Sequence, residues 1–359
     1  MIKLIDKYIL KKFFSTFFFV TLIILAVINV IDFGEKTDDF ISKKIPLELI
    51  LIDYYINFTL HINNMLSPIL VFIAVVFITS RMAARTEIVA ILASGVSFIR
   101  LLMPYVAGAV ILAIATFFLN AWVIPKANKI RVAFESKYIR GQYYFDQRDI
   151  HIKVAPETFI YMQSYNNISK VGYLFTIEKL RGNKLEAKLV ADRIAYDTTK
   201  NTWKIDYYKL HTFDGEQERI ESGNALDTAL NLSPNDFEST HELQTALTLP
   251  ELKAYINKQL SRGNTNVGIF AVEMYEKYTY PFAIIILTIM GVIVSARKSR
   301  QGTGWQIALG FFLAFVFITL VRMCKSMGQA GSLEPLTAAL IPPLLFAGIA
   351  VLLYKTVPR

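Results

Sequence analysis

Long apolar segments alternate with short polar ones over most of this chain, and six of them are long enough to cross a membrane. A helix needs about 20 apolar residues to span a hydrocarbon core of roughly 30 Å. The segments that meet this criterion are Phe13–Ile31, a run ending at Thr79, Leu101–Ile124, Tyr280–Ala296, Trp305–Val321 and Leu336–Tyr354. The pattern predicts six transmembrane helices, three on each side of a long central segment.

The central segment has a different pattern, in which short stretches alternate between apolar and polar residues and are separated by turn residues. In Arg148–Val154, for example, Ile150, Ile152 and Val154 fall on one face of a strand. Such alternation, with a turn about every 8 to 12 residues, is typical of an all-β sandwich or barrel-like sheet. We therefore predict three parts: helices in residues 1–134, a β domain in 135–245 with its strands at roughly 140–240, and helices in 246–359.

An amphipathic helix is predicted between the β domain and the fourth span. Thr248 and Glu251 have the spacing of a capping box, and Gly263 provides a stop signal after the helical periodicity. This helix leads the chain back toward the membrane.

The composition and the placement of charge support a membrane protein and indicate its orientation. The chain is 54% hydrophobic and only 19% charged, with a net charge of +9. Basic residues cluster beside the spans, so the charge favours a membrane topology and not binding to nucleic acid. The clusters are the lysines before Phe13, Arg81/Arg85/Arg100, Arg297/Lys298/Arg300 and Lys355/Arg359. By the positive-inside rule both termini are cytoplasmic, which places the β domain outside an inner membrane.

No pattern of catalytic or metal-binding residues stands out. Gly263 and Gly268 have the spacing of a phosphate loop, but Ile269 and Phe270 follow where Lys and Ser or Thr are required. The four histidines are scattered, and the single cysteine excludes an intramolecular disulfide and a multi-cysteine metal site. We expect a non-catalytic protein without a cofactor or metal of its own.

The segment Arg81–Ser97 is unusual because it separates two apolar runs yet reads as a short helix that Gly95 can end. One interpretation is an interfacial helix whose arginines contact lipid headgroups and whose Glu87 pairs locally. The other is a coupling helix, a rigid cytoplasmic projection that docks on a separate ATPase, with Glu87 pairing with an arginine of that partner.

Four motifs give the chain a resemblance to a known family, the LptF/LptG permeases of the lipopolysaccharide export transporter. The motifs are LIDKYILKKFF, RTEIVAILASG, LPELKAYINKQLSRGN and YEKYTYPFAIIILTIMG. They lie in the order expected for three spans, an outer β domain and three further spans. The resemblance implies an α-helical polytopic membrane protein with an inserted periplasmic all-β jellyroll domain.

The resemblance also implies partners and a mechanism. In that family the cytoplasmic helix docks on an LptB-like ABC ATPase dimer, which uses the ATP, and a second LptF/LptG-type permease completes the transporter. Lipopolysaccharide leaves the inner membrane and passes through the β domain to LptC-like and LptA-like periplasmic jellyroll proteins. The coupling residues that this implies here are Arg81, Arg85, Glu87, Ser94 and Gly95.

In the family the first and fifth spans form lateral gates, and basic residues near the outer end of the first span contact lipid A phosphates. The corresponding candidates are Lys36, Lys43, Lys44, Arg322 and Lys325. Spacing places Arg322 and Lys325 on one helix face. Periodicity also places an apolar stripe on the first span, which we expect to receive acyl chains: Phe14, Phe17, Val20 and Ile24.

Two other functions remain open from the residues alone. A permease of another ABC-type lipid or lipoprotein exporter has a similar plan. A layout with four spans would favour that class, whereas this sequence predicts six. A membrane-bound glycolipid-modifying enzyme would need clustered catalytic residues at the membrane face, and the sequence nominates none.

Overall fold

The computed structural model describes residues 3–140, 148–182, 184–215, 217–234, 237, 242–263, 267–296 and 303–355. The chain divides into two compact units. The helical unit comprises residues 1–134, 244–253 and 268–359, and the β unit comprises residues 135–243 and 254–267. Arg297, Lys298, Arg300 and Arg359, which contribute to the predicted basic clusters, lie outside the described residues.

Six helical stretches of the described chain are long and apolar enough to cross a membrane, which confirms the prediction of six spans. Two of them are assembled from consecutive helices with π-helical turns at the joints. The first three spans are α1 (Leu4–Ser42), α2–η1–α3 (Leu47–Leu49, Ile50–Ile56 and Asn57–Ala84) and α5–η2–α6 (Phe98–Phe118, Leu119–Val123 and Ile124–Tyr138). The last three are α9 (Gly268–Ser295), α10 (Thr303–Gln329) and α11 (Pro335–Tyr354).

The helices extend beyond the apolar runs because polar residues that favour helices flank those runs. α1, for example, begins nine residues before Phe13 and continues past Ile31 to Ser42. Charged residues in these extensions reach the ends of the bundle, where they meet charged residues of neighbouring helices.

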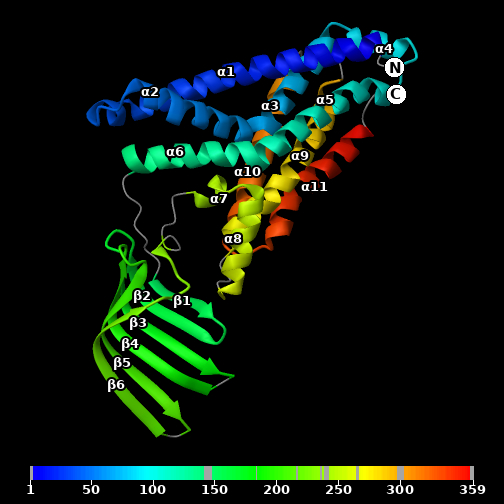
Figure 1. The fold of residues 1–359 in the computed structure, drawn as a ribbon. Coiled ribbons are helices and arrows are strands. Elements are labelled where there is room, and N and C mark those ends of the chain that lie inside the picture. Colours follow the sequence, from blue (N-terminus) through cyan, green and yellow to red (C-terminus); the bar gives the residue numbers. More distant parts are fainter. Residues whose placement is uncertain are drawn as a thin grey trace. The chain divides into compact units, whose positions relative to one another are not determined.

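Two apolar cores hold the helical unit together, and α9 contributes to both. One core joins α1, α3 and α5 with α9, and it includes Phe13, Val71 and Ile284. The other joins α3, α10 and α11 with α9, and it includes Phe72 and Phe346. Figure 1 shows α9 running between α5 and α11. α1 and α10 therefore lie at the edges, where each leaves a broad apolar face uncovered.

The β unit is one antiparallel sheet whose strands are neighbours in chain order (Figure 1). The strands are β1 (Arg148–Ala155), β2 (Thr158–Asn166), β3 (Val171–Arg181), β4 (Lys184–Asp197), β5 (Thr202–Asp214) and β6 (Gln217–Thr228). The prediction of an all-β domain between the third and fourth spans is thus confirmed. The described residues form one six-stranded sheet, whereas a sandwich would have two packed sheets.

The core of the β unit follows the predicted alternation. Ile150 and Val154 are buried, whereas the residues between them are more exposed. Buried Trp203 donates its indole N–H to the carbonyl of Leu232 at 2.8 Å, which fastens the segment after β6 across the sheet. Phe237 completes this core by packing against Tyr165.

Two short helices, α7 (Leu243–Ala246) and α8 (Leu249–Ser261), lead back from the sheet to α9. Glu251 forms its half of the capping box predicted for α8, because it accepts hydrogen bonds from the backbone N–H of Thr248 at 2.9 Å and from its hydroxyl at 2.7 Å. Gly263 has φ +79° after the helix, as its role as a stop requires.

Candidate functional site

The segment predicted to couple to an ATPase contains a separate short helix, α4 (Glu87–Ala93). α3 ends at Ala84, and Thr86 takes a left-handed conformation with φ +59° before α4 begins. After α4, Gly95 has φ +86° and donates its N–H to Leu92 at 3.0 Å, which confirms the predicted glycine stop. Left-handed residues therefore separate α4 from both neighbouring spans.

α4 has one buried face and one exposed face. Ile88 is only 2% exposed and belongs to the core shared by α1, α3, α5 and α9. Val89, the next residue, points to the exposed face and is 53% exposed. Four of the predicted coupling residues flank this exposed face and are themselves exposed: Arg81, Arg85, Ser94 and Gly95. Together with Val89, these residues form the exposed surface of α4.

Glu87 is oriented differently, because its carboxylate contacts α1. It lies 3.0 Å and 3.4 Å from the ammonium of Lys12 and accepts a hydrogen bond of 2.9 Å from the hydroxyl of Tyr8. Partial burial disfavours the charged carboxylate, but the bonds from Lys12 and Tyr8 outweigh that effect and lower the pKa of Glu87. The Glu87 side chain is 25% exposed, so it is accessible at the edge of the α4 surface.

A second ion pair lies at the same end of the helical unit. Arg100, at the start of α5, contacts Asp6 of α1 at 2.6 Å. The rings of Phe98 and Tyr354 are 6.2 Å apart, so the end of α11 lies here as well. Figure 1 shows α4 beside the two termini. We call this region the terminal end of the helical unit.

At the opposite end, the candidate gate lysines of α1 are mostly paired within the chain. Lys36 lies 2.7 Å from Asp32 and also bonds to the hydroxyl of Tyr54, a fully buried side chain of η1. Lys43 pairs with Asp39 at 3.3 Å on the exposed surface of α1. Lys44 follows in an exposed turn with φ +49°. Among these lysines, Lys36 is thus bound most tightly to its own chain.

The candidate gate residues of α10 point in different directions, although three residues separate them. Lys325 faces α9 and forms ion pairs with Glu273 at 2.9 Å and Glu276 at 2.5 Å. Arg322 is exposed, and its guanidinium lies 2.8 Å from the sulfur of Met65. Of these two residues, Arg322 is therefore the one that presents a cation to the surroundings of the helical unit.

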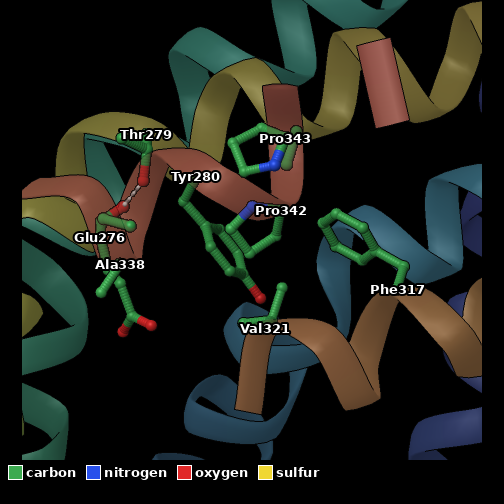
Figure 2. A pocket seen from close by; sticks show the side chains of 10 residues that line it. Glu276, Thr279, Tyr280, Phe317, Val321, Ala338, Pro342 and Pro343 are labelled. Carbon is green, nitrogen blue, oxygen red and sulfur yellow. Dashed lines mark hydrogen bonds between the residues drawn. The ribbon is translucent and has the colours of Figure 1, made fainter. Parts of the chain in front are cut away.

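A small cavity of about 20 Å³ lies beside this cluster, among α9, α10 and α11. Glu276 and Thr279 form part of its wall, and Figure 2 shows the ring of Tyr280 pointing between Pro342 and Val321. A space of this volume holds about one water molecule, so the cavity is too small for an acyl chain.

The predicted apolar stripe on α1 is wrong as a lipid-facing surface. Phe17 is 7% exposed, and Phe14, Val20 and Ile24 pack against the core of the helical unit. The periodicity was real, but its stripe faces α3 and α5 because those helices supply the other half of the core. The uncovered face of α1 instead carries Phe18, Phe19, Leu22, Val27 and Val30.

The sequence analysis did not predict the contacts of several polar residues that organise both ends, although Lys12 and Arg100 were assigned to basic clusters. These residues are Asp6, Tyr8, Lys12 and Arg100 at the terminal end, and Glu273, Glu276 and Lys277 at the other. Only the carboxylates of α9 could have been recognised from the sequence, since an acidic residue within a span requires a cation nearby. No local pattern could indicate Lys12, because its partner is 75 residues away in the chain.

Six spans, an inserted antiparallel sheet and a short helix between the second and third spans together define a multi-pass membrane protein with a β domain. The chain belongs to the lipopolysaccharide export system permease LptF/LptG family, whose model matches residues 7–356. It is similar to the lipopolysaccharide export system permease protein LptG of Haemophilus influenzae, with 19% identity over 350 residues that cover 96% of each chain. It is also similar to the protein of the same name from Escherichia coli K12, with 18% identity over 263 residues and 73% of each chain.

Family membership confirms the resemblance and the permease function, and with the six spans it supports an inner-membrane location. The individual coupling and gate residues stay predictions.

Proposed function

We propose that this chain is one permease half of an ATP-driven transporter that extracts lipopolysaccharide from the inner membrane, and that the ATPase is a separate cytoplasmic dimer. The match of the family model over residues 7–356 carries this proposal. The chain itself contributes helices, a docking helix and a β domain, and the partner contributes ATP hydrolysis.

The exposed face of α4 is the proposed docking surface. Val89 supplies an apolar anchor, Arg81 and Arg85 supply flanking charges, and Gly95 allows close approach because no atom lies within 4 Å of its Cβ position. Anchors of this kind fill a groove, while the surrounding charges set orientation and association rate. Glu87 at the edge of this surface is the proposed partner of an arginine in the groove.

Both termini and α4 are proposed to be cytoplasmic, because the basic residues concentrate at the terminal end. The β unit is then periplasmic, where its exposed strand β6 offers an unpaired edge to LptC-like and LptA-like jellyroll proteins. The uncovered faces of α1 and α10 are proposed to meet the second LptF/LptG-type permease and the glycolipid.

For the phosphorylated headgroup we propose Arg322 as the principal contact, since its guanidinium is exposed and can bind phosphate with two parallel hydrogen bonds. Lys43 and Lys44 are exposed secondary candidates. Lys36 and Lys325 would first have to leave their carboxylate partners, so they are better placed to orient the gate helices than to bind free phosphate.

Affinity capture of the ATPase tests this function. A charge at Val89 should abolish an apolar anchor, so Val89→Asp should lower recovery of the co-purifying ATPase about tenfold or more. Glu87→Lys should weaken recovery too, because it replaces attraction to a groove arginine with repulsion. Leu4→Asp is the matched control, since Leu4 is an exposed apolar residue of α1 at the same end, 90% exposed. Unchanged recovery with Val89→Asp would exclude α4 as the docking surface.

A further inference from the structure

We propose that Lys12 and Tyr8 are positioning residues that tie α4 to α1 through Glu87, so that displacement of α4 is transmitted directly to the first span. This inference rests on the proposed function, in which the ATPase moves α4. It assigns to Glu87 a contact within the chain in addition to its proposed contact with the partner.

The geometry at Glu87 is that of a tether. Both carboxylate oxygens lie within 3.4 Å of the ammonium of Lys12, and one also accepts the hydroxyl proton of Tyr8 at 2.9 Å. The same ammonium lies 4.2 Å from the centre of the Tyr8 ring. Lys12 and Tyr8 are four residues apart on α1, so they occupy one helix face and both bind the carboxylate of Glu87.

A second ion pair fixes α1 close by, but to a different element. Asp6 contacts Arg100 of α5 at 2.6 Å, one helical turn or more before Lys12. α1 is consequently held at its start by α5 and, further along, by α4. The Asp6–Arg100 pair connects α1 to α5, while the Lys12–Glu87 pair connects α1 to the short helix that faces the partner.

The connections of α4 along the chain favour transmission through this tether. Thr86 and Gly95 interrupt the helix on both sides, so α4 is not a rigid continuation of either α3 or α5. Ile88 anchors the buried face in the core, but apolar contacts have no preferred direction. A charge-assisted hydrogen bond is directional, so it carries a displacement of α4 to α1 with a defined sense.

α1 is suited to respond because little of it is fixed by packing within the chain. Its uncovered apolar face runs from Phe18 to Ile31, and only one stripe packs against the core. The far end of α1 is fixed by bonds of Asp32 and Lys36 to Tyr54, so a displacement at Glu87 can tilt the start of α1 about that far end. Loss of Lys12 should therefore uncouple transport from hydrolysis without removing the docking surface.

The decisive experiment uses proteoliposomes that contain the permease complex with its co-purified ATPase and lipopolysaccharide. Lys12→Met should retain ATPase recovery and ATP hydrolysis, but the lipopolysaccharide released per ATP should fall about 3-fold to 10-fold. Lys11→Met is the matched control, because Lys11 is an exposed lysine of the same helix one position away. Release per ATP that is equal in Lys12→Met and Lys11→Met would overturn the tether.

The conservative variant Lys12→Arg supplies a second test that leaves Glu87 and the docking surface unchanged. If the tether acts, Lys12→Arg should release more lipopolysaccharide per ATP than Lys12→Met, since a guanidinium can also bind the Glu87 carboxylate. Release by Lys12→Arg no better than that by Lys12→Met would contradict the proposal. A wild-type complex that hydrolyses ATP without any release would instead refute the proposed function, so the two failures are distinguishable.

Discussion

Ion pairs at the ends of the spans show why the direction of a charged side chain is difficult to predict from spacing. Arg322 and Lys325 are three residues apart, yet Lys325 turns toward two carboxylates of α9 whereas Arg322 is exposed. A charge in an apolar region lowers its free energy by finding an opposite charge, and this effect outweighs helical periodicity. The sequence indicated which residues were costly to place in a membrane but not which pairs they would form.

The Lys325 cluster gives a stability prediction at this scale. Lys325→Met should destabilise the protein by about 3 kcal/mol, because it leaves Glu273 and Glu276 close together without a cation. The second variant Lys325→Met/Glu276→Gln should recover part of that loss, since only one carboxylate then stays charged. Thermal unfolding of the purified protein in detergent measures both, with the exposed-pair variant Lys43→Met as control.

If the thermal unfolding midpoint of Lys325→Met equals that of Lys43→Met, the Lys325 cluster contributes no more to stability than an exposed ion pair. An exposed pair contributes about 0.2 to 1 kcal/mol, so the two expectations are well separated.

At the scale of elements, the sequence predicted α4 and α8 well because their ends carry local signals. Gly95 and Gly263 both adopt the left-handed conformation that a glycine stop implies, and Glu251 caps α8 as expected. The π-helical segments η1 and η2 were not predicted, because a wider helical turn arises from packing and has no local signature. The prediction that the apolar stripe of α1 faces lipid was wrong for a similar reason, since periodicity does not indicate whether lipid or a neighbouring helix covers the stripe.

The capping box of α8 gives a pH-dependent prediction. Hydrogen bonds from the hydroxyl and N–H of Thr248 lower the pKa of Glu251, so the folded state favours its charged form. A lowered carboxyl pKa contributes stability above the ordinary value of 4.5, and this contribution disappears as the pH falls through the folded-state pKa. Glu251→Ala should therefore weaken the first turn of α8 at pH 7 by about 0.5 to 1 kcal/mol.

Hydrogen–deuterium exchange of residues 249–253 measures this effect when variants are compared at the same pH. At pH 7 the exchange rate of Glu251→Ala divided by that of the wild type should exceed the exchange rate of Lys253→Ala divided by that of the wild type. The ratio for Glu251→Ala should approach 1 as the pH is lowered through the carboxyl range. A ratio that does not change with pH would mean that the carboxylate charge plays no part in the cap.

At the scale of the whole molecule, the six spans and the β domain were predictable because each depends on a repeated pattern and not on single residues. Apolar length identified the spans, and alternation identified the strands. The single meander of β1 to β6 was less accessible, since a sandwich and one open sheet share the same alternation. Family membership rests on still longer patterns, and it covers residues 7–356 although pairwise identity to the LptG relatives is below 20%.

The uncovered faces of α1 and α10 give a last prediction, which concerns the whole transporter. Phe18 on α1 and Phe315 on α10 are exposed, whereas Phe17 and Phe317 beside them are buried in the two cores. These four residues form matched pairs of identical chemistry that differ only in direction. If the exposed faces line the path of the glycolipid, photo-crosslinkers at Phe18 and Phe315 should capture lipopolysaccharide in cells several-fold more than those at Phe17 and Phe317.

A crosslinker at Arg322 should capture it too if Arg322 binds the headgroup as proposed, because an exposed guanidinium can bind phosphate with two hydrogen bonds. Capture of only the second permease at Phe18 and Phe315 would assign these faces to the subunit interface and leave the glycolipid path elsewhere. Equal capture from buried and exposed positions would contradict the directions of α1 and α10 described here. The comparison is informative in each case because burial, and not residue type, is the only property that changes within a pair.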